Sequence, residues 1–178
     1  MESFVRWAIL VRIVNESQSK GHPVGHTYMQ KLTYLLQNAL QIQLGYAFRI
    51  HYYGPYSEEV WQDLRILDEL KILNVTPQKD GYGYSITLGE NSGLFDGYES
   101  TVPSGAISKL VEVLGGCEVK ILEIIATTHY AYSFLTSTNL EESKLAEETA
   151  KAVTALKPHI HPSQVSTAIG IMKELAWI

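Results

Sequence analysis

The hydrophobic pattern changes its period repeatedly between residues 26 and 88, and the changes predict helices interleaved with short strands. Residues 26–40 carry apolar side chains at steps of three and four, as on the buried face of a helix. Residues 48–53 alternate between apolar or aromatic and polar side chains, which predicts a strand. Residues 54–57, Gly-Pro-Tyr-Ser, are expected to end that strand.

Ser57 is expected to begin the next helix, which runs to about Leu70. Serine is a favourable N-cap residue, and the two glutamates after it suit the positive end of a helix dipole. Residues 73–88 then form two β-prone runs on either side of Asp80 and Gly81. Because Asp-Gly is typical of tight turns between strands, these runs predict a β-hairpin.

The order of these elements is that of a winged-helix variant. An almost wholly apolar first helix is expected over residues 4–14, followed by a polar connection over residues 15–25. Helix, helix, strand, helix and hairpin then follow in turn. Residues 41–56 separate the second and third helices by more than the tight turn of a DNA-binding helix-turn-helix, which disfavours that use.

The C-terminal part is expected to be helical. Before it, the glycine-rich residues 89–103 include Leu94, Phe95 and Tyr98, so this loop is expected to pack against the body. Residues 138–141 match a capping box that would open a helix there.

The predicted fold class is therefore α+β. It comprises a winged-helix-like module over residues 1–92, a packed loop over 93–103 and a helical layer over 104–178, together forming one compact unit.

Composition narrows the classes of protein. Hydrophobic residues make up 46% of the chain and charged residues 19%, which is typical of a globular protein. The net charge of −5 disfavours binding to nucleic acid through bulk charge. Cys117 is the only cysteine, so an internal disulfide is impossible. The first residues lack the basic region of a signal peptide, and the apolar run near them is too short for a membrane span. We expect a cytoplasmic protein without a membrane partner.

Three stretches together resemble a known group. They are residues 29–36 (MQKLTYLL), 52–60 (YYGPYSEEV) and 120–127 (KILEIIAT). In this order and spacing they resemble the small bacterial YwgA-like proteins and, more distantly, the Panacea (SocA-type) antitoxins. The first group has no established activity, and the second works through protein contacts. The resemblance therefore implies a bacterial, non-enzymatic accessory role, and it carries over no catalytic residue.

DNA recognition by the helix after Ser57 is disfavoured by its charge. Its outward face is predicted to carry Glu58, Glu59, Gln62, Arg65, Ile66 and Glu69. Carboxylates facing DNA phosphates reduce affinity, so an acidic or protein-facing surface is the favoured interpretation. Contact with nucleic acid stays open for Arg12, Lys20, Lys31 and Lys79, provided that these side chains cluster.

The sequence contains few of the residues and motifs that metal binding or catalysis would need. His22 and His26, and likewise His159 and His161, are spaced for ligation, but a structural zinc site needs four ligands. We therefore expect surface or capping histidines. Cys117 is expected to be a small hydrophobe, and His129 a hydrogen-bonded core residue. No phosphate loop or nucleophile elbow occurs, so neither an enzyme nor a cofactor is expected.

Tyrosines concentrate around the predicted sheet. Strand packing explains most of them, but Tyr53 and Tyr56 flank a Gly-Pro turn and are candidates for an exposed binding surface. The predicted partner-binding residues are Tyr53, Tyr56, Glu58, Glu59, Gln62 and Ile66.

The preferred function is a non-enzymatic regulatory or protein-interaction module of antitoxin-like character. The alternatives are a DNA-binding winged-helix regulator and a small-molecule sensor with a pocket between the two halves. The apolar ending Trp177-Ile178 leaves a homodimer open, because it must either dock in the core or contribute to an interface.

Overall fold

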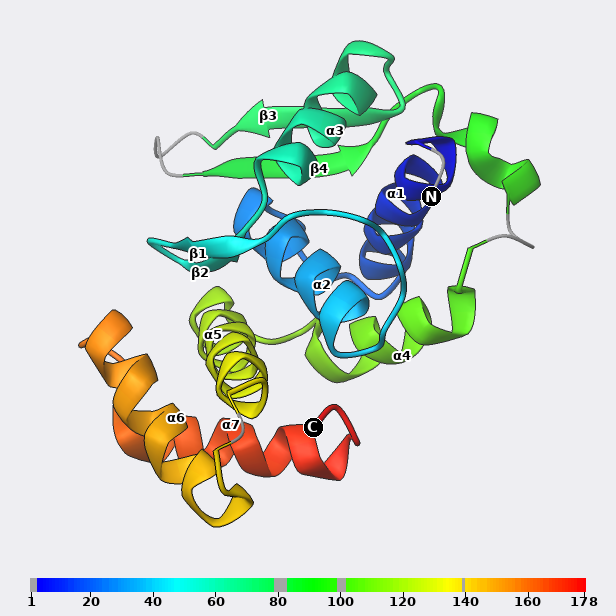
Figure 1. Cartoon of the computed structure of the whole chain (residues 1–178). Coiled ribbons are helices and arrows are strands. Elements are labelled where there is room, and N and C mark those ends of the chain that lie inside the picture. Colours follow the sequence, from blue (N-terminus) through cyan, green and yellow to red (C-terminus); the bar gives the residue numbers. More distant parts are fainter. Residues whose placement is uncertain (1–2, 79–82, 99–101, 139) are drawn as a thin grey trace.

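The computed structural model describes residues 3–78, 83–98, 102–138 and 140–178 (Figure 1). Within them it has seven α-helices, a 3-10 helix and two antiparallel two-stranded sheets, which confirms the α+β class. No helix in the described part of the chain is both long and apolar enough to span a bilayer.

The elements follow the expected order, with one additional strand. The first half contains α1 (Ser3–Ser19), α2 (His26–Asn38), β1 (Arg49–His51), β2 (Gly54–Tyr56), α3 (Glu58–Glu69), β3 (Leu73–Pro77), β4 (Tyr84–Leu88) and the 3-10 helix η1 (Ser92–Tyr98). The second half contains α4 (Ser104–Leu114), α5 (Val119–Thr136), α6 (Glu142–Leu156) and α7 (Pro162–Glu174).

Helix α2 is the centre of the molecule. It contacts α1, α3, α4, α5, β2 and β4, and residues 28–36 of it are all buried (Figure 1). Its polar side chains therefore face protein rather than water, and each needs a partner there. Two of them, Gln30 and Lys31, find theirs at the β1–β2 hairpin.

Helix α1 is longer than predicted. The expected polar connection was wrong between Asn15 and Ser19, which continue the helix. Glu16 forms ion pairs with Arg12 (3.2 Å) and Lys20 (3.7 Å), one turn away on either side. Ser17 donates to the carbonyl of Ile13 at 2.7 Å inside the core. Because these polar side chains find partners one turn away, the helix continues through the polar residues.

The first hairpin was only half predicted. Residues 54–57 were expected to break the strand, but β2 pairs with β1 in the register Arg49↔Tyr56 and His51↔Gly54. Gly54 has φ +84, a left-handed conformation that costs glycine little. The chain therefore reverses at Tyr52 and Tyr53, and the predicted break is the returning strand.

The second hairpin packs beside α3 and α1 (Figure 1). Strands β3 and β4 pair from Leu73↔Leu88 to Pro77↔Tyr84, as the two β-prone runs predict. The backbone N–H of Ile86 donates to the carbonyl of Val24 at 2.8 Å and so ties β4 to the residues before α2. The turn predicted at Asp80 and Gly81 lies outside the described residues.

Helix α5 joins the two halves of the chain. It contacts α2 and β2 on one side and α6 and α7 on the other. The buried core runs through both halves, from Leu32 and Leu64 to Ile125 and Met172. The predicted boundaries at residues 92 and 104 stay a prediction.

Capping in the C-terminal half differs from the prediction. The expected capping box at residues 138–141 was wrong, since α6 begins at Glu142 without a side-chain cap. Thr138 instead donates to the carbonyl of Leu135 at 2.7 Å, at the end of α5. A capping box occurs instead at α7, where the His161 N–H donates to the Gln164 side chain and the His161 ring accepts from the Ser163 N–H.

The loop after β4 and the chain end both pack inward. Trp177 is 8% exposed, so the chain end docks in the core, which is one of the two alternatives expected for it. Phe95 and Tyr98 of η1 also pack on the body, but Leu94 is 69% exposed, so its predicted packing was wrong. Successive residues of a 3-10 turn point in different directions, and Leu94 faces away.

Candidate functional site

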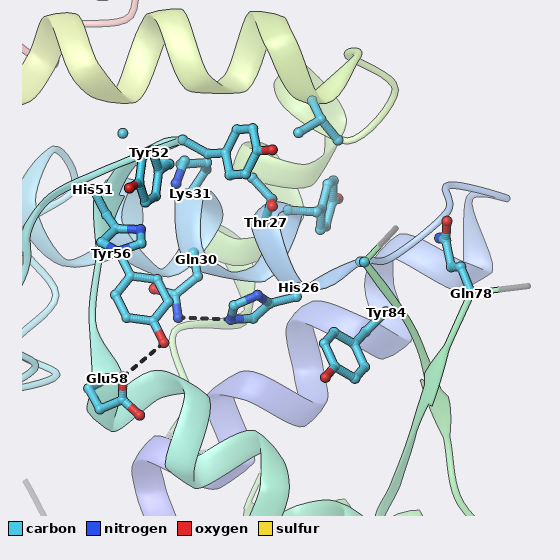
Figure 2. Close-up of a pocket in the computed structure, with 16 residues that line it drawn as sticks. His26, Thr27, Gln30, Lys31, His51, Tyr52, Tyr56, Glu58, Gln78 and Tyr84 are labelled. Carbon is cyan, nitrogen blue, oxygen red and sulfur yellow. Dashed lines mark hydrogen bonds between the residues drawn. The ribbon is translucent and has the colours of Figure 1, made fainter. Parts of the chain in front are cut away.

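The candidate site is a cavity of about 530 Å³ between the two hairpins. The start of α2 and the tip of the β1–β2 hairpin form two of its walls, and Tyr84 on β4 forms a third. Glu58 at the start of α3 and Val119 at the start of α5 complete its edge. Figure 2 shows His26, Tyr56 and Tyr84 around this cavity, with Glu58 beside Tyr56.

A continuous row of rings runs along the cavity from the hairpin tip to β4. Neighbouring ring centroids are 4.3–5.8 Å apart along the row Tyr52, His51, Tyr56, His26, Trp61 and Tyr84. The pairs are edge-on or tilted, which is the arrangement that aromatic quadrupoles favour. The rings come from the β1–β2 hairpin with its turn, from α2, α3 and β4, so the row exists only in the folded chain, and Trp61 supports it from outside the cavity lining.

The junction between β2 and α3 is held by Gln30 of α2. The Gln30 side-chain amide donates to the Ser57 carbonyl and accepts from the Ser57 N–H, each at 2.9 Å. Both residues are 1% exposed. The predicted capping by the Ser57 side chain was wrong, because its hydroxyl donates to Glu59 at 3.3 Å and caps no N–H. A distant glutamine fixes the start of α3.

Lys31 supports the same hairpin from beneath. Its ammonium donates to the Pro55 carbonyl at 2.8 Å, and the residue is 1% exposed. Burial lowers the pKa of Lys31 to about 7, while Glu123 opposes the shift and Lys157 adds to it. Lys31, a predicted nucleic-acid candidate, is thus a buried residue whose ammonium is occupied by the hairpin backbone.

The hairpin tip is also fastened from the C-terminal half. The Lys157 ammonium, directly after α6, donates to the carbonyls of His51 (2.6 Å) and Tyr52. Glu123 of α5 lies 3.6 Å from this ammonium and 3.3 Å from His159. Lys157 and Glu123 are 6% and 5% exposed, so the pair is a buried charge cluster under the hairpin.

Gly54 allows the hairpin to pack closely against α5. A Cβ at this position would lie 2.5 Å from the Thr127 hydroxyl oxygen, in addition to the strain of its positive φ. The backbone of β2 therefore approaches α5 more closely than a side chain would allow.

His26 and Tyr56, in the middle of the row of rings, are both uncharged at neutral pH. Burial lowers the pKa of His26 to about 4, the charge of Lys31 adds to the shift, and Glu58 opposes it. Burial and the hydrogen bond to Glu58 raise the pKa of Tyr56 to about 12. At neutral pH the Tyr56 hydroxyl therefore stays protonated and donates to Glu58 at 3.0 Å.

The predicted partner-binding residues divide into two groups. Tyr53, Tyr56 and Glu58 line the cavity, and Tyr53 is 63% exposed. Gln62 and Ile66 lie farther along α3, exposed but outside the lining. Glu59, also exposed, accepts from the backbone N–H of Ala47 at 2.7 Å and supports the approach to β1.

Of the three predicted basic residues that the structure describes, Lys31 lies apart from Arg12 and Lys20. Arg12 and Lys20 both pair with Glu16 on α1, and Lys31 is buried under the hairpin. Lys79 lies outside the described residues. Within the described part of the chain, no group of three or more His, Cys, Asp or Glu side chains is placed to hold a metal ion.

Sequence reasoning missed the residues that hold the hairpin, which are Gln30, Glu123 and Lys157, and it did not single out Tyr84, which lines the cavity. The available signal was the presence of two distinctive stretches, one containing Gln30-Lys31 and one containing Gly54-Pro55-Tyr56-Ser57. In the fold they meet through three hydrogen bonds.

Comparison with known proteins gives one informative similarity. No family model matches the chain. The chain is similar to the uncharacterised protein YwgA of Bacillus subtilis (strain 168). The two are 26% identical over 127 residues, which cover 69% of this chain and 72% of YwgA. This similarity supports a YwgA-like protein, and it assigns no activity.

Proposed function

We propose that the protein is a non-enzymatic protein-interaction module, and that the aromatic cavity is the surface where its partner docks. The supporting observation is the exposure of Tyr52 and Tyr53, at 80% and 63%, on a backbone fastened from beneath. Tyrosines are enriched among the residues that dominate binding energy at interfaces. Two adjacent exposed rings at the tip of a hairpin fit that use better than a role in packing.

The anchoring of the hairpin adds to the proposal. Gln30, Lys31 and Lys157 bind backbone groups of the hairpin and of the residue after it, so its conformation does not depend on a partner. A preformed surface loses less conformational entropy on binding than a mobile loop does. The buried lysines and the buried glutamine amide under the exposed aromatic tip would keep the surface preformed in this way.

The finer function is proposed as regulatory and antitoxin-like. The resemblance of three sequence stretches to Panacea-type antitoxins supports such a role, whereas the similarity to YwgA assigns none. We further propose that α3 and the β3–β4 hairpin are a winged-helix-like unit used for protein contacts. Glu58, Glu59 and Glu69 on the exposed side of α3 support contact with protein rather than DNA.

Site-specific photo-crosslinking in bacterial cells tests the proposal. A photoreactive phenylalanine in place of Tyr53 is expected to capture a discrete partner. The same group in place of Phe134 is the control, because that residue is 64% exposed but lines no part of this cavity. The identified partner is then purified, and its affinity is measured with the wild type and with Tyr53→Ala.

Loss of the Tyr53 ring is expected to weaken this complex about tenfold or more while leaving thermal unfolding unchanged. Equal affinity of the wild type and both Tyr52→Ala and Tyr53→Ala would contradict the proposal. Capture at Phe134 alone would place the partner surface on another face.

A further inference from the structure

We infer that the cavity accepts a cationic side chain, arginine above all, presented by the protein partner. The inference deepens the proposed function and rests on it. It follows from the rings that line the cavity, from the charges at its edge and from the net charge of the chain.

The rings supply the first argument. Five tyrosines line the cavity: Tyr28, Tyr52, Tyr53, Tyr56 and Tyr84. A guanidinium or ammonium group is attracted to the negative face of such rings, and arginine does this most often in proteins. Tyr56 and Tyr84 lie on either side of His26 (Figure 2), whose centroid is 5.8 Å and 6.2 Å from theirs.

The charges at the edge supply the second argument. Among the described lining residues, Glu58 is the only exposed side chain with a permanent charge. The Tyr56 hydroxyl donates to one Glu58 oxygen and holds the carboxylate beside the ring row. The opposing ammonium of Lys31 is 1% exposed and is occupied by the Pro55 carbonyl. The accessible charge of the cavity is therefore negative.

Charge complementarity favours arginine in particular. Its planar guanidinium can stack on a tyrosine while donating to a carboxylate, whereas a lysine ammonium is a more strongly hydrated point charge. The net charge of −5 would also steer a basic partner toward this chain. A cavity of about 530 Å³ leaves room for the partner residues on either side of the arginine.

Three blocked tripeptides test the inference: acetyl-Gly-Arg-Gly-amide, its citrulline counterpart and its lysine counterpart. Citrulline keeps the size and planarity of arginine but carries no charge. Binding is followed by NMR shifts of the His26 and tyrosine rings up to about 20 mM peptide. We expect millimolar binding of the arginine peptide, affinity about tenfold weaker for citrulline, and lysine in between.

Two variants that each remove one negative charge test whether the Glu58 carboxylate is the group that binds the arginine. Glu58→Gln is expected to weaken binding of the arginine peptide about tenfold and to leave that of the citrulline peptide unchanged. Glu69→Gln, on the same helix but outside the cavity, is expected to change neither.

Equal binding of arginine and citrulline by the wild type would overturn the inference, as would the absence of any shift with arginine. An equal effect of Glu58→Gln and Glu69→Gln would also overturn it, because a diffuse field rather than the cavity would then attract the peptide. Such results leave the proposed function intact if crosslinking at Tyr53 still captures a partner.

Discussion

Single side chains inside the core decide how the binding surface is held. Gln30 uses both ends of its amide on the backbone of Ser57, whereas the Ser57 hydroxyl caps nothing. A serine directly before a helix suggested a local side-chain cap at this junction, but the structure shows that Gln30 of α2 holds it instead. The two explanations predict different mutational effects.

Gln30→Ala is therefore expected to destabilise the protein by about 1–3 kcal/mol, because it leaves the buried Ser57 N–H unpaired and removes one of the two donors to the Ser57 carbonyl. Ser57→Ala is expected to cost less than about 1 kcal/mol, since only a 3.3 Å bond to Glu59 is lost. Urea unfolding of both variants checks the difference. An equal or larger cost for Ser57→Ala would show that the serine caps α3 after all.

Protonation of buried histidines makes stability depend on pH. Burial lowers the pKa of His129 to about 4, and its Nδ1 lies 2.9 Å from the Tyr34 hydroxyl. The unfolded chain takes up this proton near pH 6.5, before the folded protein does. The contribution of His129 to the free energy of unfolding is therefore fully present above pH 6.5. It is lost as the pH drops from 6.5 to 4, which lowers the stability by up to about 3 kcal/mol.

Thermal unfolding between pH 7.5 and pH 4.5 tests this sign. The wild type should lose stability on acidification, and His129→Gln should lose less, because glutamine can still accept from Tyr34 but does not titrate. A remaining slope is expected from His26, whose pKa is also lowered to about 4. Parallel curves for the wild type and the variant would contradict the assignment.

The β1–β2 hairpin is the element that carries the exposed tyrosines, and it depends on the C-terminal helices. Lys157 and its partner Glu123 bring charge from that half to the tip. Removing the ammonium leaves the carbonyls of His51 and Tyr52 without this donor. The tip should then open locally while the rest of the fold persists.

Lys157→Met is expected to speed chymotrypsin cleavage after Tyr52 and Tyr53 about tenfold or more. Lys151→Met, within the helix that Lys157 directly follows, is the control, since Lys151 is exposed and pairs with Glu147 and Glu148 on the surface. Cleavage after the exposed Phe134 reports general unfolding. If all three sites become labile together, Lys157 stabilises the whole fold and not the tip.

For the molecule as a whole, charge argues against tight binding to duplex DNA. The net charge is −5, Glu58, Glu59 and Glu69 lie exposed on α3, and Lys31 is buried. Binding without sequence preference needs several cations facing the phosphates. We expect a dissociation constant above about 10 µM at roughly 150 mM salt, measured by fluorescence anisotropy. Sub-micromolar binding would instead favour the DNA-binding alternative.

Much of the architecture could be predicted because helices and strands leave periodic marks in the sequence. The apolar steps in α2, the two runs of β3 and β4, and the proline at the start of α7 all lie where local physics places them. The same local evidence singled out Tyr53 and Tyr56, since a Gly-Pro pair between aromatic residues is visible in the sequence.

The assembly of the site could not be predicted in that way. Gln30 and Ser57 are 27 residues apart, and Lys157 and Tyr52 are 105 apart. A hydrogen bond between such residues leaves no periodic trace, because its partners are chosen by the packing of whole elements. The sequence alone therefore indicated the elements and one exposed ring of the hairpin tip, Tyr53, but not its neighbour Tyr52. Packing around α2 and α5 determined which rings meet, which charges are sealed and which carboxylate faces the cavity.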